Sequence, residues 1–484
     1  MTSPTIGIIG SGFGALAAAI ELKKAGHGDI RLWEQSDEIG GVWRDNTYPG
    51  AGCDVPSPLY SFSFEPNPNW SRRYALQPEI HKYIKDTAVK YGIAHLVQFG
   101  VAVVAAAYDE GRATWTVTLD NGETQEVDLL VTAVGQLSRP KMPHIGGLDS
   151  FEGPAFHSAQ WDHSFDPKGK RVAVIGTGAS AIQFVPHLAE DVAELTVFQR
   201  SPAYIAPKPD QPYTSLHRKM FEKIPTILRA ERSILWVFLE QLARGLDDDS
   251  PMGKVNKALC LQHLKKQVKD PELRKKLTPD YPVGCKRVLF SNNYLPAIVR
   301  ANVELVTEAV AEIKPNSVVA ANGSEYEVDA LVVSTGFETQ DFLNSIDITG
   351  VGGQKLATQW TDGARAYLGT YAPNFPNFFI MYGPNTNLGA GSIIYMLEAQ
   401  ARHMRQAIDR LVAGGYRSVA VKAEAEETYD QDIQKRLANS AWTHCSSWYH
   451  HASGRITSNW PGGTKPFAKR TKVLDPEAFE WTAT

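Results

Sequence analysis

Two glycine patterns in the chain have the spacing of a dinucleotide-binding turn. The segments 10–15 (GSGFGA) and 176–181 (GTGASA) both fit G-x-G-x-x-A. In such a turn the first glycine makes a tight bend, the second lets a pyrophosphate touch the backbone, and the small third residue lets a helix pack on a strand. The phosphates lie at the helix N-terminus, where N–H groups and the helix dipole favour anions. The sequence therefore predicts two dinucleotide sites.

The residues that follow each pattern predict different nucleotides. Glu34 ends the apolar run after the first pattern, and a carboxylate there can accept hydrogen bonds from both ribose hydroxyls. The second pattern has no acid at the corresponding place, where the chain reads Gln199-Arg200-Ser201. Since arginine pairs with a 2′-phosphate and a carboxylate repels it, we expect NADP(H) at the second site.

Two dinucleotides in one chain imply electron transfer between them. NADPH donates a hydride that a flavin can accept, so FAD is the simplest occupant of the first site. The four cysteines, Cys53, Cys260, Cys285 and Cys445, contain no C-x-x-C pair that could carry the electrons on. Dioxygen, a quinone or a protein acceptor remains to reoxidise the flavin.

Two longer patterns resemble a known family. Phe151, Gly153, His157, Trp161 and Asp162 match F-x-G-x-x-x-H-x-x-x-W-[PD], and residues 40–54 match [AG]-G-x-W-x-x-x-x-[FY]-P-[GM]-x-x-x-D. Both are fingerprints of the type I Baeyer–Villiger monooxygenases, which are flavin-dependent class B enzymes that use FAD and NADPH. The resemblance covers nearly the whole chain. It implies that the segment 151–162 is a linker between two modules rather than a source of acid–base groups.

The resemblance also implies the catalytic residues. Arg287 stands where the family holds its active-site arginine, and Asp54 where it holds the acidic partner. A guanidinium would stabilise the flavin peroxide and the tetrahedral adduct formed when it attacks a ketone, which gives an ester or a lactone. NADP would stay bound and shield the flavin. The predicted cofactor-binding residues are Gly10, Gly12, Phe13, Ala15, Glu34, Gly41, Val42, Trp43, Asp54, Tyr60, Val103, Gln136, Gly176, Thr177, Gly178, Ser180, Gln183, Arg200, Ser201, Lys286, Arg287 and Trp448, and no metal site is predicted.

Three alternatives use the same nucleotide turns. A flavin-containing heteroatom monooxygenase, which oxidises sulfur or nitrogen, would not require Arg287. An NADPH-dependent flavin reductase or diaphorase would return electrons without oxygen transfer. A protein that merely holds a nucleotide would show no turnover at all.

The elements that must position these residues follow from hydrophobic periodicity. Ile6–Gly10, Ala15–Leu22 and Ile30–Trp33 read as strand, helix and strand, and residues 171–176, 179–188 and 194–198 repeat that order. The predicted fold class is α/β, with two Rossmann-like dinucleotide-binding domains for FAD and NADPH and a helical insertion in the second. A long helix is expected from about Ser392 to Val412, ended by Gly414-Gly415. The predicted boundaries are 1–142 and 341–484 for the FAD-binding domain with the C-terminal region, 150–202 and 283–340 for the NADP-binding domain, and 203–282 for the insertion.

Composition narrows the possible partners. The 484 residues carry 49 basic and 53 acidic side chains, which gives no basic surplus for nucleic acid or an anionic membrane. Four cysteines in such a chain do not make a disulfide framework. No apolar run approaches a membrane span, and the first residues lack the features of a signal peptide. We expect a cytoplasmic monomer or small homo-oligomer that binds a small ketone and dioxygen.

Overall fold

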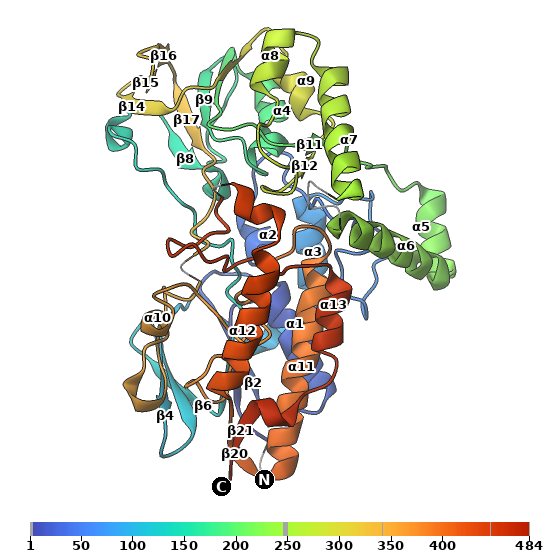
Figure 1. The fold of residues 1–484 in the computed structure, drawn as a ribbon, viewed down its shortest axis with the longest axis vertical. Coiled ribbons are helices and arrows are strands. Elements are labelled where there is room, and N and C mark those ends of the chain that lie inside the picture. Colours follow the sequence, from blue (N-terminus) through green and yellow to red (C-terminus); the bar gives the residue numbers. More distant parts are fainter. Residues whose placement is uncertain (1–2, 245–249, 341, 446, 484) are drawn as a thin grey trace.

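Two parallel sheets with the same strand order form the cores of two lobes, which lie one above the other in Figure 1. The computed structural model describes residues 3–244, 250–340, 342–445 and 447–483. We call the lobe built on the first sheet the first lobe and the other the second lobe. Both ends of the chain lie at the far end of the first lobe (Figure 1).

The first sheet has the order β19-β7-β1-β2-β3, and all its pairs are parallel. Helix α1 follows β1 and packs against the long helix α11. Alanine-rich α1 has high helix propensity, and it ends before Gly26, whose φ is +95°. The bounds are β1 Ile6–Ile9, α1 Phe13–Lys24, β2 Ile30–Glu34, α2 Val42–Asp45, α3 Gln77–Lys90, β3 Val97–Phe99, β7 Leu129–Thr132, β19 Phe378–Ile380 and α11 Ile393–Gly414.

The second sheet repeats this arrangement in the order β13-β10-β9-β17-β8, again with parallel pairs only. Strands β9 and β10 therefore correspond to β1 and β2, and β17 corresponds to β7. The bounds are β8 Ala155–His157, β9 Arg171–Ile175, α4 Ala181–Asp191, β10 Glu194–Phe198, α9 Tyr294–Ile298, β13 Val303–Val306 and β17 Ala330–Val333. Helix α4 begins two residues later than the sequence predicts, because residues 179–180 form a turn.

Each sheet is accompanied by an antiparallel hairpin unit. Strands β4–β6 form a meander with β18 beside the first sheet, and β14–β16 form one beside the second. Asn121-Gly122 and Asn322-Gly323 lie in the hairpin turns between β5 and β6 and between β15 and β16. The bounds are β4 Val103–Asp109, β5 Thr114–Leu119, β6 Thr124–Val127, β14 Val310–Lys314, β15 Ser317–Ala320, β16 Glu325–Glu327 and β18 Asp347–Thr349.

The segment expected to be a helical insertion also contains a short strand near its start. Strand β11 (Ile205–Ala206) pairs in parallel with β12 (Leu289–Phe290). The pair is too short to give a periodicity signal, so the sequence does not reveal it. The helices are α5 Ser215–Lys223, α6 Pro225–Ala243, α7 Pro251–Gln267 and α8 Pro271–Lys276, and residues 245–249 of the predicted insertion lie outside the described residues.

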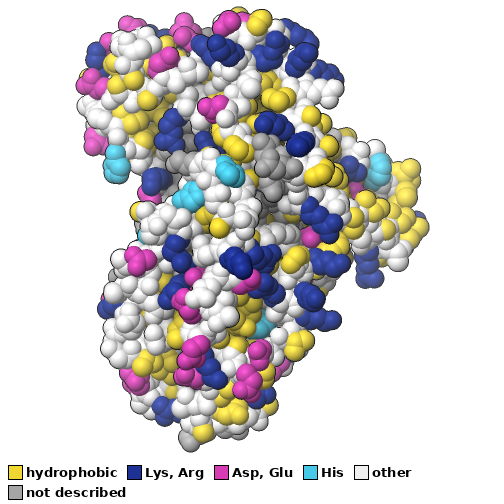
Figure 2. Space-filling model, in the orientation of Figure 1, with side chains coloured by type: hydrophobic (Ala, Val, Ile, Leu, Met, Phe, Trp, Pro, Cys, Tyr) yellow, Lys and Arg dark blue, Asp and Glu magenta, His cyan; other side chains and the backbone are white. Residues whose placement is uncertain are grey.

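Helices α5 and α6 project from the side of the molecule. Their outer face exposes Leu216, Ile234, Val237 and Phe238, and hydrophobic side chains gather on this projection in the space-filling view (Figure 2). The inner face of α6 lies against the first lobe, where Trp236 and Glu240 are hydrogen-bonded to Thr464.

The C-terminal part of the chain returns to the first lobe. Strand β19 joins β7, and α11 ends at Gly415 in the left-handed conformation (φ +67°), which confirms the predicted long helix. The remaining elements are α10 Leu356–Gln359, β20 Tyr416–Val421, α12 Ala423–Leu437, α13 Thr464–Arg470 and β21 Phe479–Ala483, with 3-10 turns at Ala94–Leu96, Leu148–Ser150, Ser158–Gln160, Val351–Gly353, Ala441–His444 and Pro476–Ala478.

Two chain segments connect the lobes and pair with each other. Lys141 N–H donates to the Gly336 carbonyl (2.9 Å) and Glu338 N–H donates to the Arg139 carbonyl (2.9 Å). We call residues 136–142 and 334–340 the paired linkers. Within the described part of the chain, no helix is long and apolar enough to cross a membrane.

Glu426 on α12 gives a testable pH dependence of stability. It is 2% exposed, and burial raises its pKa to about 7 from 4.5. The folded protein therefore holds the proton more tightly than the unfolded chain, so this group's stabilisation is present below pH 4.5 and is lost as the pH rises to 7. Between pH 5 and pH 8 we expect the wild type to lose roughly 2 kcal/mol of unfolding free energy because of this group. Glu426→Gln should not show this part of the loss, and urea titration at each pH measures it.

Glu427→Gln is the matched control, because the neighbouring Glu427 is half-exposed and lies beside Arg365. It should keep most of the pH dependence, because burial is the largest cause of the raised Glu426 pKa and the charge of Glu427 is a smaller one. Equal slopes of stability against pH in the wild type and Glu426→Gln would contradict the assignment.

Candidate functional site

The first nucleotide turn has the geometry that a dinucleotide needs. Gly10 has φ +103°, and a Cβ there would lie 2.7 Å from the Ala133 carbonyl oxygen. Helix α1 begins after Gly12 with no side-chain cap, so the backbone N–H groups of its first turn could receive an anionic ligand. The backbone of Gly41 lies opposite Gly12, where a Cβ on either residue would fill the gap. These features fit a pyrophosphate.

Glu34 stands at the end of β2 beside this turn. One carboxylate oxygen accepts from Ser11 Oγ (2.6 Å), and the other accepts from Ser36 N–H (3.0 Å) and lies 3.0 Å from Arg44 Nη1. A cavity of about 260 Å³ opens just beyond, lined by Gln35, Ser36, Arg44 and residues of the first paired linker. This cavity is at the carboxyl edge of the sheet, where the nucleoside end of a dinucleotide lies in such folds.

The second nucleotide turn repeats the first. Gly176 has φ +107°, and a Cβ there would lie 2.3 Å from the Ser334 carbonyl oxygen, which corresponds to the contact of Gly10 with Ala133. A Cβ at Gly178 would meet nothing within 4 Å, so the outer face of the turn is open. The two turns therefore occupy equivalent places in equivalent sheets.

Two cations gather beside the second turn. Lys286 Nζ donates to Ser201 Oγ (2.8 Å) and lies 4.6 Å from the centre of the Tyr281 ring. Burial lowers the pKa of Lys286, and the charge of neighbouring Arg200 lowers it further. Two positive charges held close together favour an anion between them. Lys286 and Arg200 therefore fit a 2′-phosphate.

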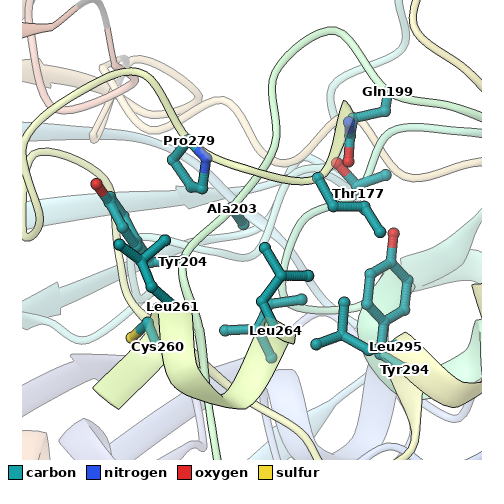
Figure 3. Close-up of a pocket in the computed structure, with 12 residues that line it drawn as sticks. Thr177, Gln199, Ala203, Tyr204, Cys260, Leu261, Leu264, Pro279, Tyr294 and Leu295 are labelled. Carbon is teal, nitrogen blue, oxygen red and sulfur yellow. The ribbon is translucent and has the colours of Figure 1, made fainter. Parts of the chain in front are cut away.

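A small pocket lies between the second turn and the helical segment (Figure 3). Its volume is about 10 Å³, and its walls are mostly apolar. The Tyr294 hydroxyl points toward Thr177 and Gln199 in this pocket, and it is buried without a hydrogen-bond partner among the described residues. Burial raises the pKa of this hydroxyl, so it stays a neutral donor.

Arg287 and Asp54 form an ion pair that joins the two lobes. Arg287 Nε and Nη2 donate to the two Asp54 oxygens at 3.1 and 2.9 Å, a bidentate contact. The Asp54 carboxylate raises the pKa of the Arg287 guanidinium above its ordinary value. The Arg287 side chain is 34% exposed, so part of it remains accessible while Asp54 fixes its direction.

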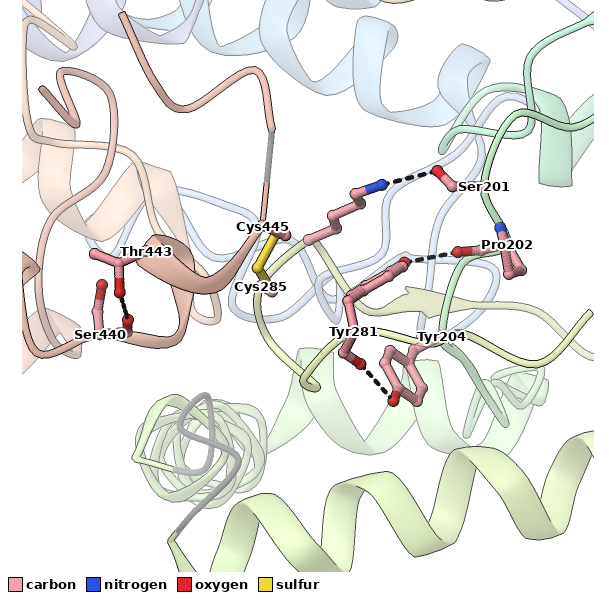
Figure 4. The surroundings of a disulfide bond; sticks show 9 residues. Ser201, Pro202, Tyr204, Tyr281, Cys285, Ser440, Thr443 and Cys445 are labelled. Atoms are coloured by element: carbon pink, nitrogen blue, oxygen red, sulfur yellow. Dashed lines mark hydrogen bonds between the residues drawn. A yellow bond between two sulfur atoms is a disulfide. The ribbon is translucent and has the colours of Figure 1, made fainter. Parts of the chain in front are cut away.

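The Arg287 segment is held at both ends. Strand β12 begins two residues after Arg287, and Cys285, two residues before it, forms a disulfide with Cys445 (Figure 4). The chain therefore contains one disulfide in its described part, between partners 160 residues apart. A search for short cysteine spacing cannot find such a pair. Cys53 and Cys260 are free and buried.

The pattern over residues 40–54 docks the second lobe onto the first. The Gln183 side chain of α4 accepts from Tyr48 Oη and Gly52 N–H (both 3.1 Å) and donates to the Gly52 carbonyl (3.0 Å). The sequence predicts Gln183 as a cofactor ligand, but its amide is engaged in these contacts. Trp43 of the same pattern donates to Tyr60 Oη (3.0 Å), and the two rings meet edge to face.

The other first-lobe residues predicted to bind a cofactor lie around the first turn or behind it. Phe13 and Ala15 are buried on α1, and Phe13 packs against the Tyr60 ring. Val42 starts the short helix α2. Val103 lies on β4 in the buried cluster under the hairpin unit.

Gln136 and Trp448 approach the space between the lobes. Gln136 donates to the carbonyls of Tyr382 and Gly383 (2.9 and 3.1 Å), and its own carbonyl oxygen is buried without a partner among the described residues. Trp448 is 40% exposed, and its carbonyl accepts from Thr339 Oγ1 (3.3 Å). On the second lobe, Ser180 precedes α4 without capping it by its side chain.

The segment 151–162 runs into the second sheet. His157 ends β8 and is 2% exposed, its Nδ1 accepts from Ala159 N–H (3.1 Å), and burial lowers its pKa. Trp161 packs on Phe156 and Phe184. Gly153 is required because a Cβ there would lie 2.3 Å from the Asp329 carbonyl oxygen, while Phe151 packs under the hairpin unit and Asp162 accepts from Ser164. These contacts are those of packing residues.

Sequence reasoning missed three contributors to this site. Tyr449 is buried beside Arg287 and is hydrogen-bonded to its backbone. Lys208 reaches across to the carbonyl of Cys53. The Cys285–Cys445 disulfide completes the set, and no spacing rule points to any of the three. Among the described residues, no group of three or more His, Cys, Asp or Glu side chains could hold a metal ion.

Comparison with known proteins gives full-length matches. Residues 4–231 match the family model described as pyridine nucleotide-disulphide oxidoreductase. A Baeyer-Villiger monooxygenase of Pseudomonas aeruginosa is 41% identical over 482 residues, which cover 99% of this chain and 92% of the relative. A solved structure of an oxidized steroid monooxygenase bound to NADP has a TM-score of 0.88 at 30% identity and full coverage of both chains. A structure of OTEMO in complex with FAD and NADP has a TM-score of 0.88 at 28% identity and 99% coverage of both.

Removal of the disulfide gives a test of how the C-terminal loop is held. In Cys445→Ser the segment 441–460 loses its covalent tie to the Arg287 segment, so it should open more often. We expect limited proteolysis to cut this segment about threefold faster or more than in the wild type.

Dithiothreitol should have the same effect on the wild type and none on Cys445→Ser, which is the control for the reagent. Equal cleavage rates in the oxidised wild type and the variant would contradict the prediction.

Proposed function

The chain belongs to the Baeyer–Villiger monooxygenase family, and from that membership we propose which residues perform its reaction. It is an FAD- and NADPH-dependent oxidoreductase that converts ketones into esters or lactones. Its substrates are a small ketone and dioxygen. The observation that carries the assignment of roles is the bidentate Arg287–Asp54 pair at the junction of the lobes.

The first turn is proposed to hold FAD and the second NADP(H). Gly10, Gly12 and the start of α1 would receive the FAD pyrophosphate, with Glu34 facing the ribose. Gly176, Thr177 and Gly178 would receive the pyrophosphate of NADP, and Arg200, Ser201 and Lys286 its 2′-phosphate. When bound, FAD accepts a hydride from NADPH and activates dioxygen, so that one oxygen atom enters the bond beside the ketone carbonyl and the other leaves as water.

Arg287 is proposed to stabilise negative charge at the reacting centre. Negative charge collects on the ketone oxygen as its carbonyl is attacked, and a fixed guanidinium in a partly enclosed site stabilises it more than water would. The pKa of Arg287 is raised by Asp54, so the side chain stays charged throughout. Its protons are held too tightly for Arg287 to act as an acid in the reaction.

Asp54 is proposed to aim Arg287 and to balance its charge. Its two oxygens accept from Nε and Nη2, which leaves the remaining guanidinium N–H groups for the reacting oxygen. Tyr449 supports the same segment from the C-terminal loop. The loop that carries Trp448 would close this end of the site and exclude water.

The family relationship disfavours the two enzymatic alternatives. A heteroatom oxygenase needs no arginine at the ketone position, whereas this chain fixes one with a dedicated carboxylate. The full-length relatives are named Baeyer-Villiger monooxygenases and not reductases, which disfavours a reductase without oxygen transfer.

The division of the chain stays part of the proposal. Residues 1–142 and 341–484 would form the FAD-binding domain, 150–202 and 283–340 the NADP-binding domain, and 203–282 the insertion. The two domains would shift against each other during turnover. We also propose a cytoplasmic monomer or small homo-oligomer with no nucleic-acid partner, which light scattering and fractionation would test.

Ketone oxidation under labelled dioxygen tests the proposed function. We expect the wild type to consume NADPH and to place one ¹⁸O atom in the ester. Arg287→Ala should lower ester formation by about 10²–10³-fold, because the charge on the ketone oxygen is then unopposed. NADPH oxidation should continue in the variant and yield hydrogen peroxide.

Arg287→Lys is the matched control, since it keeps the charge but loses the bidentate contact. It should fall between the wild type and Arg287→Ala. If the wild type gives no labelled ester across a broad panel of ketones, or if Arg287→Ala retains wild-type ester yield, the assignment is wrong.

Coenzyme preference tests the predicted 2′-phosphate site. Removing Lys286 or Arg200 deletes a charge-assisted contact, so the KM for NADPH should rise about tenfold in Lys286→Ala and Arg200→Ala. The KM for NADH should change little, because NADH lacks the 2′-phosphate. Exposed Lys170→Ala is the control. Equal changes for both coenzymes would place the 2′-phosphate elsewhere.

A further inference from the structure

A second cation of the second lobe reaches the Cys53–Asp54 stretch. Lys208 Nζ donates to the Cys53 carbonyl at 3.1 Å, and Arg287 binds the carboxylate of the next residue, Asp54. Lys208 follows β11 by two residues and Arg287 precedes β12 by two, and these strands are paired in parallel. One small sheet therefore presents both cations to two consecutive residues of the first lobe.

The backbone of Lys208 is fixed on both sides. It lies between Pro207 and Pro209, whose rings restrict the chain. Lys208 N–H donates to Asn292 Oδ1 (3.0 Å), and Asn292 Nδ2 donates back to the Lys208 carbonyl (2.8 Å). Because the backbone is already held, only side-chain freedom is lost when the ammonium makes a hydrogen bond.

The residues after Lys208 are bound to the first lobe as well. Asp210 accepts from Tyr74 N–H (3.2 Å) and pairs with Arg72 (2.8 Å). Tyr213 N–H donates to the Ser71 carbonyl (2.8 Å). The segment 208–213 is therefore tied to residues 71–74, so Lys208 keeps its place relative to Cys53.

The ammonium of Lys208 lies in partly buried surroundings. Lys208 Nζ lies 5.1 Å from the centre of the Tyr74 ring. Burial lowers its pKa, and the charge of Asp54 opposes that effect. The contact of this partly buried lysine is an anchor on the peptide before Asp54.

We propose that Lys208 is a positioning residue for the ketone oxidation: it holds the Cys53 carbonyl, fixes the Cys53–Asp54 peptide, and so aims the Asp54 carboxylate at Arg287. This role rests on the proposed function. Without the anchor, Asp54 would follow Arg287 wherever it moves, and the guanidinium would lose its fixed direction toward the reacting oxygen.

A double-mutant cycle tests the role. Lys208→Met keeps the length of the side chain but removes the donor, and we expect it to lower kcat for ester formation about tenfold and to raise the fraction of NADPH electrons that appears in hydrogen peroxide. The KM for NADPH and the bound FAD per chain should stay within about twofold of the wild type. Lys208→Arg, which can donate to the same carbonyl, should recover most of the lost kcat.

The cycle separates positioning from simple bracing of the lobes. Because Lys208 is proposed to act through Asp54, Lys208→Met should change ester formation less than about twofold in an Asp54→Asn background. Lys82→Met, at an exposed lysine in an ion pair on α3, is the control and should equal the wild type.

Each remaining outcome counts against the proposal. Multiplicative losses in the cycle, or a kcat and a peroxide fraction unchanged in Lys208→Met, would overturn it. Failure of Lys208→Arg to recover kcat while FAD content stays normal would overturn it too. If Lys208→Met does not fold, Lys208→Gln replaces it in the cycle and is held to the same criteria. Lys208→Arg remains the variant that should recover kcat. Absence of labelled ester from the wild type would overturn the proposed function itself, and the role of Lys208 with it.

Discussion

The site depends on one ion pair that no single lobe can make. Arg287 belongs to the second lobe and Asp54 to the first, so the bidentate contact exists only while the lobes meet. A guanidinium held by a carboxylate keeps its direction, and a paired charge is less costly to enclose than a lone one. The contacts of Gln183 with Gly52, of Glu240 with Thr464, and of segment 208–213 with residues 71–74 all act on the same junction. Their common effect is to bring residue 54 within reach of residue 287.

The fold reaches this arrangement by repeating one unit. Two parallel sheets of the same order each place a glycine turn at the carboxyl edge, and Gly10 and Gly176 approach corresponding carbonyl oxygens. The differences between the repeats carry the differences in chemistry. Glu34 ends β2 in the first, whereas Arg200 follows β10 in the second. The segment inserted after β10 adds the β11–β12 sheet, which supplies the cations that face the first lobe.

The sequence predicted what local patterns encode and missed what the chain brings together from afar. The repeated βαβ order, the hairpin turns and the long helix to Gly415 follow from periodicity and turn residues. Strand β11 has two residues and gives no such signal. Gln183 is predicted as a cofactor ligand, and the sequence does not reveal that its amide contacts Gly52, 131 residues away. The sequence gives no signal for the Lys208 contact or for the Cys285–Cys445 disulfide, because the partners are 155 and 160 residues apart.

The paired linkers have a consequence for how such a chain can be rearranged. Arg139 and Glu338 are hydrogen-bonded neighbours, although the whole second sheet lies between them in sequence. The second lobe is thus an insertion in the first, and the paired linkers that lead into it and out of it lie side by side. A nicotinamide-binding module from a relative could be grafted at these two splice points without changing the path of the first lobe. The disulfide would be lost in such a chimera unless the grafted module brought its own cysteine near position 285, because Cys445 lies outside the exchanged part.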